Sequence, residues 1–134
     1  MRILIADDSE IDQKVLASML KRQGECQVVS SGSAVLEAIE KSYGEENPFG
    51  LLCLDIIMPD LAGHEVLQRI RNLEKAKKIA KADRLRIVMT TGLHDVKHIL
   101  KATNLGCDGY VTKPVEKERL MIELSKMGLV VKWE

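Results

Sequence analysis

One stretch constrains the fold of this chain more than any other, residues 51–59 with the sequence LLCLDIIMP. Its apolar run is typical of a strand that is buried on both faces of a sheet. An ionised carboxylate such as Asp55 cannot lie inside that strand without a partner, so we expect it at the carboxyl end, where open α/β sheets place ligands. Pro59 cannot join the ladder of a sheet, so the chain must turn there.

Short apolar runs alternate with helical patterns along the rest of the chain. This alternation predicts an α/β fold in which a parallel sheet has helices on both faces, joined by right-handed crossovers. With five strands, the flavodoxin-like order 2-1-3-4-5 is expected. The predicted strands are residues 3–6, 26–30, 51–55, 85–90 and 109–112.

The helices are predicted from apolar residues that recur three and four positions apart. Ser9, with Asp12 three positions later, resembles a capping box that opens the first helix. Residues 69–86 contain neither Gly nor Pro, and they fit either one long helix with a loop near Ala82 or a helix followed by a structured insertion. The side chains expected to face the core include Ile11, Val15, Leu16, Met19 and Leu20 in the first helix and Val96, Ile99 and Leu100 in the fourth.

The polar residues that follow the strands should meet at one edge of this sheet. Asp7 and Asp8 follow the first strand, Asp55 ends the third, Thr91 follows the fourth and Lys113 follows the fifth. Three carboxylates in one crevice repel each other unless a cation joins them, and Mg²⁺ prefers carboxylate, water and phosphate oxygens. A mobile ammonium and a hydroxyl donor beside them suit the stabilisation of a phosphoryl group in transfer, with Asp55 as the nucleophile. An Asp pair alone would be explained as a turn or helix cap, so the interpretation depends on all five residues meeting.

These residues lie in motifs that resemble the receiver domains of two-component response regulators, of the CheY-like type. The motifs are DDS at 7–9, DIIMP at 55–59, TG at 91–92 and YVTKP at 110–114, and the resemblance covers nearly the whole chain. It implies a phosphorylation-dependent signalling switch, in which Asp55 accepts a phosphoryl group from a sensor histidine kinase or a histidine phosphotransfer protein. It implies no conventional enzyme, because such a domain catalyses only its own phosphorylation and slow autodephosphorylation.

The resemblance also implies how the site holds its metal and its phosphoryl group. Asp8, Asp55 and the backbone carbonyl of Ile57 would bind Mg²⁺ directly, with Mn²⁺ as an alternative ion, and Asp7 would act mainly through water. The side chains that would contact phosphoryl oxygens are those of Thr91 and Lys113.

The switch and the output surface follow from the same resemblance. Tyr110 would be the switch aromatic, and a partly buried core aromatic is the alternative interpretation of this residue. A cis peptide bond is implied between Lys113 and Pro114. An output partner would bind the face formed by the fourth helix, the fifth strand and the fifth helix, and the protein would be a monomer or a phosphorylation-dependent dimer.

Two positions depart from the family pattern near the phosphoacceptor. Ile57 and Leu93 are apolar where many receivers carry polar side chains. Neither can orient a hydrolytic water by hydrogen bonding, so we predict slow self-dephosphorylation, on the order of hours. Shielding of the site by the same two side chains would have the same effect.

Residues 69–86 form a second departure, because this segment is longer and more basic than the family usually has. It holds eight basic and two acidic side chains, which leaves a local charge of +6. A solvated helical face explains this charge simply, and a docking patch for an acidic partner or weak nucleic-acid contact is the alternative.

Composition excludes several classes of protein. The chain of 134 residues has a formal net charge of zero and no apolar run near the roughly 20 residues that span a bilayer, so neither membrane nor nucleic acid is an expected partner.

We expect one receiver domain over residues 1–134, with a core to about residue 128 and a short tail at 129–134. The cysteines match no zinc or disulfide framework, which indicates a reducing, cytoplasmic setting, and the histidines are expected at the surface. These residues are Cys26, Cys53, Cys107, His64, His94 and His98.

Three other functions remain to be weighed against the switch. A phosphatase with an aspartyl-phosphate intermediate needs a second Asp two residues after the nucleophile, where this chain has Ile57. A flavodoxin-like FMN carrier needs a glycine- and hydroxyl-rich loop after the first strand, where this chain has Asp7 and Asp8. A receiver-like interaction module that is never phosphorylated would not need the complete set of five residues.

Overall fold

The computed structural model describes residues 1–92 and 96–133, apart from the side chain of Val96. Strands and helices alternate in it, as the sequence predicts. The elements are β1 (Arg2–Ala6), α1 (Glu10–Leu20), β2 (Glu25–Val29), α2 (Gly32–Ser42), β3 (Phe49–Asp55), α3 (Gly63–Ala76), a 3₁₀ turn η1 (Lys81–Asp83), β4 (Arg86–Thr91), α4 (Val96–Asn104), β5 (Gly109–Thr112) and α5 (Lys117–Lys126).

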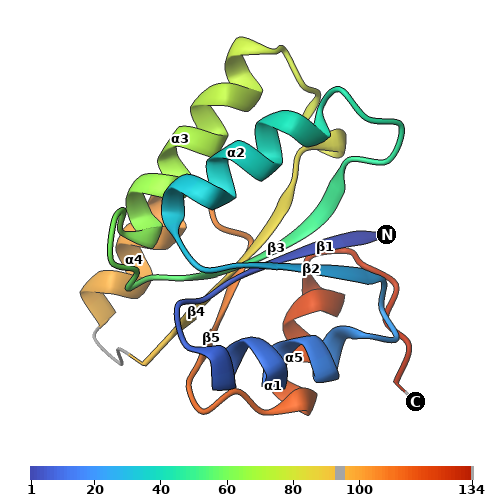
Figure 1. Ribbon diagram of the computed structural model, residues 1–134, viewed down its shortest axis with the longest axis vertical. Coiled ribbons are helices and arrows are strands. Elements are labelled where there is room, and N and C mark those ends of the chain that lie inside the picture. Colours follow the sequence, from blue (N-terminus) through green and yellow to red (C-terminus); the bar gives the residue numbers. More distant parts are fainter. Residues whose placement is uncertain (93–95, 134) are drawn as a thin grey trace.

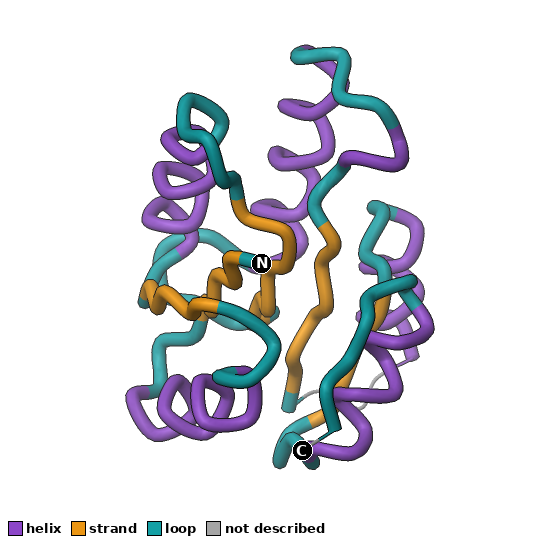
Figure 2. Tube along the Cα trace, turned by 90° about the vertical axis from the view of Figure 1, so that its right-hand side faces the viewer, coloured by secondary structure: helices purple, strands orange, loops and turns teal. Residues whose placement is uncertain are grey.

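The described strands form one parallel sheet in the order β2-β1-β3-β4-β5, which confirms the predicted topology. Helices α2, α3 and α4 cover one face of this sheet, and α1 and α5 cover the other (Figure 1). In Figure 2 the strands lie in the interior with the helices around them. The fold therefore has three layers, helix on sheet on helix.

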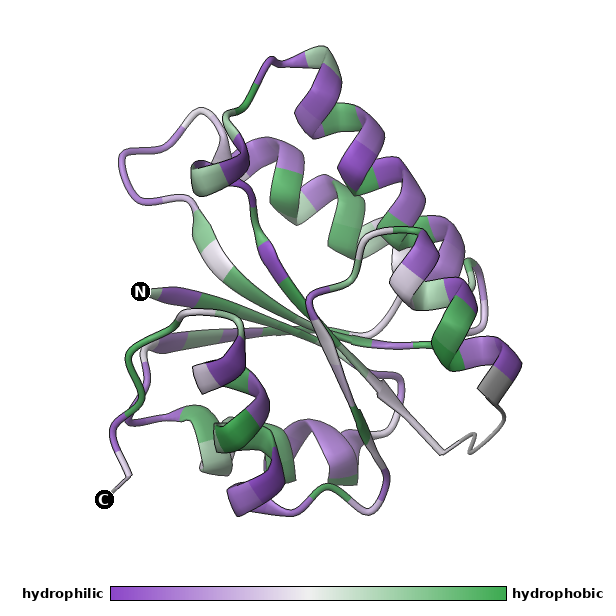
Figure 3. Ribbon diagram, turned by 180° about the vertical axis from the view of Figure 1, so that it is seen from behind, coloured by the Kyte–Doolittle hydropathy of each residue, from purple (hydrophilic) through white to green (hydrophobic). Residues whose placement is uncertain are grey.

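Each face of the sheet carries its own hydrophobic core. Along β1, Leu4 and Ala6 pack on the side of α2, α3 and α4, whereas Ile3 and Ile5 pack on the side of α1 and α5. Burial on both faces explains why the central strands are continuously apolar rather than alternating. Figure 3 shows this pattern, with hydrophobic colour along the central strands and both colours along the helices.

Helix α1 begins as predicted but presents a narrower apolar face than its sequence indicates. The hydroxyl of Ser9 accepts a hydrogen bond from the backbone N–H of Asp12, which caps the helix. Leu16 and Leu20 are fully buried, but Ile11 is 75% exposed and Val15 is 40% exposed. The prediction that these two face the core is wrong, because Leu16 and Leu20 form the stripe that contacts the sheet, and Ile11 and Val15 lie about 140° away from that stripe around the helix.

Helix α4 shows a similar difference. Leu100 was expected to face the core but is 56% exposed, while Ala102 is buried against the α2, α3 and α4 side of the sheet. Ile99 is half-buried. The helix meets the sheet through a small residue, which leaves the larger leucine at the surface.

The segment after α3 resolves the choice between one long helix and a helix with a structured insertion. Helix α3 ends at Ala76, the following turn places Lys78 at a φ of 55°, and η1 precedes β4. A left-handed residue cannot continue an α-helix, so the chain must turn here.

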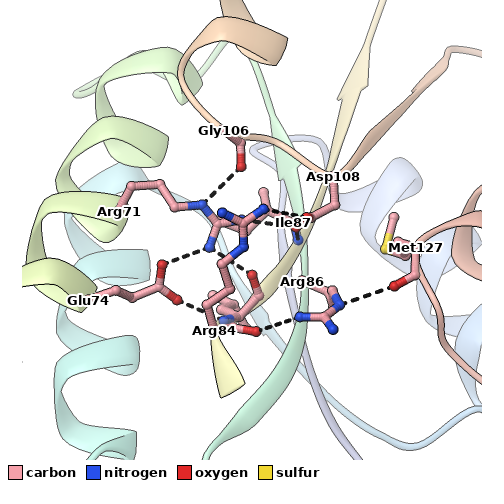
Figure 4. A network of polar contacts seen from close by, with 9 residues as sticks. Arg71, Glu74, Arg84, Arg86, Ile87, Gly106, Asp108 and Met127 are labelled. Atoms are coloured by element: carbon pink, nitrogen blue, oxygen red, sulfur yellow. Dashed lines mark hydrogen bonds and ion pairs between the residues drawn. The ribbon is translucent and has the colours of Figure 1, made fainter. Parts of the chain in front are cut away.

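Three of the eight basic side chains of this segment lie in a polar network rather than on a solvated face. The Arg71 side chain is 9% exposed, and its guanidinium donates to Glu74 Oε1 at 2.8 Å, Asp108 Oδ2 at 2.9 Å and the carbonyls of Leu85 and Gly106 (Figure 4). Arg84 donates to the other oxygen of Asp108 at 3.1 Å. Arg71, Arg84 and Arg86 therefore lie in a polar network that joins α3 to the start of β4, the loop before β5 and the end of α5, whereas Arg69 and the four lysines of the segment are exposed.

The structure also places two of the three histidines and all three cysteines. His64 is only 6% exposed, so its predicted surface position is wrong, and its ring stacks on that of His98 with centroids 5.7 Å apart. His94 lies outside the described residues, as does Leu93. Cys26, Cys53 and Cys107, which all fall within the described ranges, are free thiols.

Residues 129–132 lie against the domain. Leu129 and Val131 pack on the core between the sheet, α1 and α5, and Gln23 exchanges hydrogen bonds of 2.6 and 2.9 Å with the backbone of Lys132. Trp133 remains 55% exposed. None of the helices in residues 1–92 and 96–133 has the length and apolar character needed to cross a membrane.

Candidate functional site

The predicted site residues lie at the carboxyl ends of four strands. Asp7 directly follows β1, Asp55 ends β3, Thr91 ends β4 and Lys113 comes directly after β5. The strands are held in register here, since the backbone N–H of Lys113 donates to the carbonyl of Thr91 at 2.7 Å. Gly63 lets α3 start tight against the end of β3, because any side chain at this position would clash with the carbonyl of Asp55.

The acidic pair after β1 divides into a buried and an exposed member. Asp7 is fully buried and Asp8 is exposed. Asp7 Oδ1 accepts a hydrogen bond from the backbone N–H of Ser9 at 2.9 Å, and its carbonyl accepts one from the Gln13 side chain. Asp7 Oδ2 accepts no hydrogen bond from any residue in the described ranges, although it lies 2.9 Å from the ammonium of Lys113.

Asp55 is the buried carboxylate at the centre of the site, with 5% of its surface exposed. Its Oδ1 accepts a hydrogen bond from the backbone N–H of Ile57 at 3.2 Å, and its Oδ2 accepts one from Lys113 at 3.1 Å. Burial raises the pKa of the Asp55 carboxyl above its ordinary value and the charge of Asp7 adds to this, while the contacts with Lys113 and Ile57 oppose it. The carboxylate is thus held in a setting that disfavours its charge.

Lys113 is the cation of the site, and it contacts one residue that the sequence interpretation missed. Besides its ion pair with Asp7 and its hydrogen bond to Asp55, the ammonium donates to Asp12 Oδ2 at 3.1 Å. Burial alone would lower the pKa of Lys113, but the three carboxylates outweigh burial and hold that pKa above its ordinary value. The Lys113–Pro114 peptide bond is cis, as the resemblance implied.

Asp12 was interpreted only as the acidic partner of a capping box. In a capping box its carboxylate would turn back to the N–H of Ser9, but that N–H bonds Asp7 instead. The spacing held the missing signal, since Asp12 lies in the first turn of α1, four residues after Asp8.

Thr91 and Tyr110 lie further along the same edge. Thr91 is 1% exposed, and Tyr110 is half-buried against the core beneath α2, α3 and α4. This partly buried position of Tyr110 is compatible with a switch aromatic and with a core aromatic. Ile57, two residues after Asp55, is 59% exposed at the mouth of the site.

The carboxylates of Asp7, Asp8 and Asp55 are arranged as a cation site would require. Each offers one oxygen, and these oxygens all lie within 4.8 Å of one another. The buried Asp7 Oδ2 is a second observation that fits a bound cation, because it pairs with the Lys113 ammonium at 2.9 Å but accepts no hydrogen bond among the described residues, and so keeps acceptor capacity for an ion. Three hard oxygen donors suit Mg²⁺ rather than a softer metal.

Comparison with known proteins finds similarity to receiver domains over nearly the whole chain. Residues 3–125 match the sequence model of the response regulator receiver domain. The chain is 30% identical over 124 residues to the chemotaxis protein CheY of Halobacterium salinarum, covering 92% of this chain and 93% of that protein. It is 31% identical to the two-component response regulator ORR41 of Oryza sativa subsp. japonica, covering 96% and 95%. It is 32% identical to the hybrid signal transduction histidine kinase L of Dictyostelium discoideum, of which it spans 7% of the length.

Solved structures give the same picture. The BeF₃-activated DrrB receiver domain superposes with a TM-score of 0.75 at 25% identity, covering 94% of this chain and 95% of that one. The receiver domain of the histidine kinase CKI1 from Arabidopsis thaliana, solved with Mg²⁺ and BeF₃⁻, superposes with a TM-score of 0.76 at 25% identity, covering 90% and 86%.

Proposed function

The chain belongs to the response regulator receiver domain family, whose members are phosphorylation-dependent signalling switches rather than conventional enzymes, and from this premise we propose that Asp55 is the phosphoacceptor. The observation that carries the proposal is the buried Asp55 carboxylate within 3.1 Å of the Lys113 ammonium, at the edge where Asp7, Asp8 and Thr91 also lie. A nucleophile, an acidic cluster and a cation are together there.

The proposed reaction moves one phosphoryl group from a phosphohistidine to Asp55. An Asp55 oxygen attacks phosphorus, the new P–O bond forms as the P–N bond breaks, and the leaving imidazole nitrogen keeps the electron pair and takes up a proton. Lys113 moves its hydrogen bond from Asp55 Oδ2 to a phosphoryl oxygen, and the Thr91 hydroxyl donates to another. Asp7, Asp8, Asp55 and the carbonyl of Ile57 would hold Mg²⁺, which when bound supplies charge stabilisation to the phosphoryl oxygens.

The kinase or phosphotransfer partner would reach Asp55 from the side of α1. Ile11 and Val15 are exposed apolar residues on this helix, and Ile57 is exposed at the mouth of the site. Exposed apolar groups around a polar site are typical of a docking surface. We therefore place the phosphodonor across α1 and the loop after β3.

The output surface would lie on α4, β5 and α5. Leu100 on α4 is 56% exposed and Ile122 on α5 is 38% exposed, so this face offers apolar contacts to a partner. Thr91, drawn to the phosphoryl group, would vacate space for the Tyr110 ring and shift the balance between two conformations of the face. We place this domain within residues 1–134 and, from its free thiols, in a reducing cytoplasmic setting.

Phosphorylation by acetyl phosphate tests the proposal directly. Wild-type protein with Mg²⁺ and acetyl phosphate should gain the mass of one phosphoryl group, and Asp55→Asn should gain none. An Asp60→Asn variant is the matched control, since Asp60 lies in the same loop but bonds the start of α2. If wild-type protein gains nothing under conditions that preserve acyl phosphates, the domain is a binding module that is not phosphorylated.

A further inference from the structure

Asp12 holds the ammonium of Lys113 from outside the acidic cluster. The ammonium donates hydrogen bonds to Asp12 Oδ2 and Asp55 Oδ2, each at 3.1 Å. Asp7 Oδ2 lies closer, at 2.9 Å, but as an ion pair without hydrogen-bond geometry. Asp12 does not belong to the cluster of Asp7, Asp8 and Asp55 whose oxygens could share a metal ion.

The backbone around Asp12 is fixed while its carboxylate reaches the mouth of the site. Its N–H bonds the Ser9 hydroxyl at 3.3 Å, which places the residue in the first turn of α1. Its side chain is 40% exposed, whereas that of Lys113 is 21% exposed and that of Asp55 is 7% exposed. Asp12 is therefore the most exposed of the three carboxylates that contact the lysine.

Phosphoryl transfer changes every other carboxylate contact of this lysine. The Asp55 oxygens become part of an acyl phosphate, and a cation in the acidic cluster would compete for Asp7 and Asp55. Lysine has a flexible four-carbon stem and does not keep its ammonium in one place unaided. Among the described residues, Asp12 supplies the hydrogen bond that can persist through the reaction.

We propose that Asp12 is a positioning residue, which holds the Lys113 ammonium at the mouth of the site so that a remaining N–H is directed at the group on Asp55. This inference rests on the proposed phosphorylation of Asp55. It assigns Asp12 to Lys113 and not to the metal or to the reacting atoms.

Three variants separate this role from charge and from folding. Asp12→Ala removes the acceptor, Asp12→Asn keeps an acceptor oxygen without the charge, and Glu10→Gln removes an exposed charge from the same turn of α1 that pairs only with Lys14 among the described residues. At saturating Mg²⁺ and acetyl phosphate, we expect phosphorylation of Asp12→Ala to be about tenfold slower, the order expected for one charge-assisted hydrogen bond. Asp12→Asn should recover most of this loss, and Glu10→Gln should match wild type.

A second measurement follows the ammonium itself. Proton exchange between the Lys113 ammonium and water, followed by nitrogen-detected NMR on unphosphorylated protein, should be faster in Asp12→Ala than in wild type or Asp12→Asn. Equal exchange in all variants, equal rates in Asp12→Ala and wild type, or an Asp12→Asn rate as low as that of Asp12→Ala would each overturn the proposal. Failure of wild type to be phosphorylated at all would instead overturn the function of Asp55, and the exchange data would then report only a resting contact.

Discussion

At the scale of single residues, the negative charge of Asp55 destabilises the folded protein. Its folded pKa is raised, mainly by burial, so the folded protein holds a proton on this carboxyl more tightly than the unfolded chain does. The ionised form therefore lowers stability at neutral pH, and stability is regained as the pH falls through the folded pKa. We expect Asp55→Asn to unfold at higher urea concentration than wild type at pH 7 without divalent ions.

The pH profile provides the control for this effect. The advantage of Asp55→Asn should shrink as the pH is lowered toward the range where the wild-type carboxyl is protonated. An Asp55→Asn protein that is less stable than wild type at pH 7 would show that the contact with Lys113 outweighs burial.

We predict that Ile57 makes the phosphorylated state long-lived. Its side chain is 59% exposed two residues after Asp55 and offers no group to orient water. In Ile57→Gln, an amide can hold the attacking water, so we expect hydrolysis of the acyl phosphate to be about tenfold faster or more. The measurement is the loss of phosphorylated mass with time after removal of acetyl phosphate. Ile57→Val, which stays apolar, should keep the slow rate, and equal half-lives in all three proteins would contradict the explanation.

The sequence could predict which residues meet but not every contact between them. Asp7, Asp55 and Lys113 follow strands, and parallel strands deliver their carboxyl ends to one edge, so their meeting follows from topology. The bond between Asp12 and Lys113 depends on how a side chain on α1 is directed, and Asp12 had an equally good local explanation as a cap. Local sequence patterns therefore could not predict whether the Asp12 side chain caps its own helix or bonds Lys113, which comes from a distant part of the chain.

At the scale of elements, the buried Arg71 joins α3 to β4 and to the loop before β5. It pairs with Glu74 and Asp108, whose side chains are 6% and 11% exposed. Replacing it by Met would leave two buried carboxylates without this partner, so we expect a loss of about 3–5 kcal/mol in the free energy of unfolding. Urea denaturation followed by circular dichroism measures this loss.

Arg69 offers a matched control on the same helix. It pairs with Glu65 at 3.0 Å, but the two side chains are 55% and 49% exposed. Arg69→Met should therefore change the free energy of unfolding by only about 0.3–0.5 kcal/mol. Similar losses in the two variants would show that the network around Arg71 contributes no more than a surface pair. The basic segment alone could not distinguish these arginines, because two of the Arg71 partners, Gly106 and Asp108, lie outside it.

The stacked His64 and His98 make the packing of α3 against α4 sensitive to pH. Burial lowers the pKa of His64, Lys101 and His98 lower it further, and the hydrogen-bond contact with the His98 carbonyl opposes them. The folded protein thus resists a proton that the unfolded histidine accepts near its ordinary pKa of about 6.5. His64 should cost stability as the pH falls below that value, because the unfolded state then binds more protons.

A comparison with His64→Gln isolates this contribution from other titrating groups. The difference in unfolding free energy between wild type and variant should move in favour of the variant when the pH is lowered from 7.5 to 5.5. A difference that stays constant across this range would show that His64 keeps its proton affinity on folding.

At the scale of the whole molecule, unfavourable charge is concentrated at one edge of the sheet and balanced charge at the other. The carboxyl edge holds Asp7, Asp8 and Asp55 close together, whereas the opposite edge holds the paired network of Arg71 and Asp108. The alternating pattern of the chain was enough to predict the first edge. The second arises from contacts between residues about 37 positions apart, which no local pattern records.

This asymmetry predicts that divalent metal should act on the stability of the entire domain. A cation that binds the folded acidic cluster, but not the dispersed carboxylates of the unfolded chain, stabilises the protein by about 2.7 kcal/mol at one hundred times its dissociation constant. Mg²⁺ should therefore raise the urea midpoint of wild type beyond the change produced by NaCl at equal ionic strength. Asp8→Asn should lose most of this response and Glu10→Gln should keep it, because only Asp8 belongs to the cluster. Because Asp55→Asn relieves the repulsion that Mg²⁺ would otherwise neutralise, the difference in unfolding free energy between this variant and wild type should narrow or reverse as Mg²⁺ is added. Equal responses of the two proteins to Mg²⁺ would show that Asp55 takes no part in binding the ion.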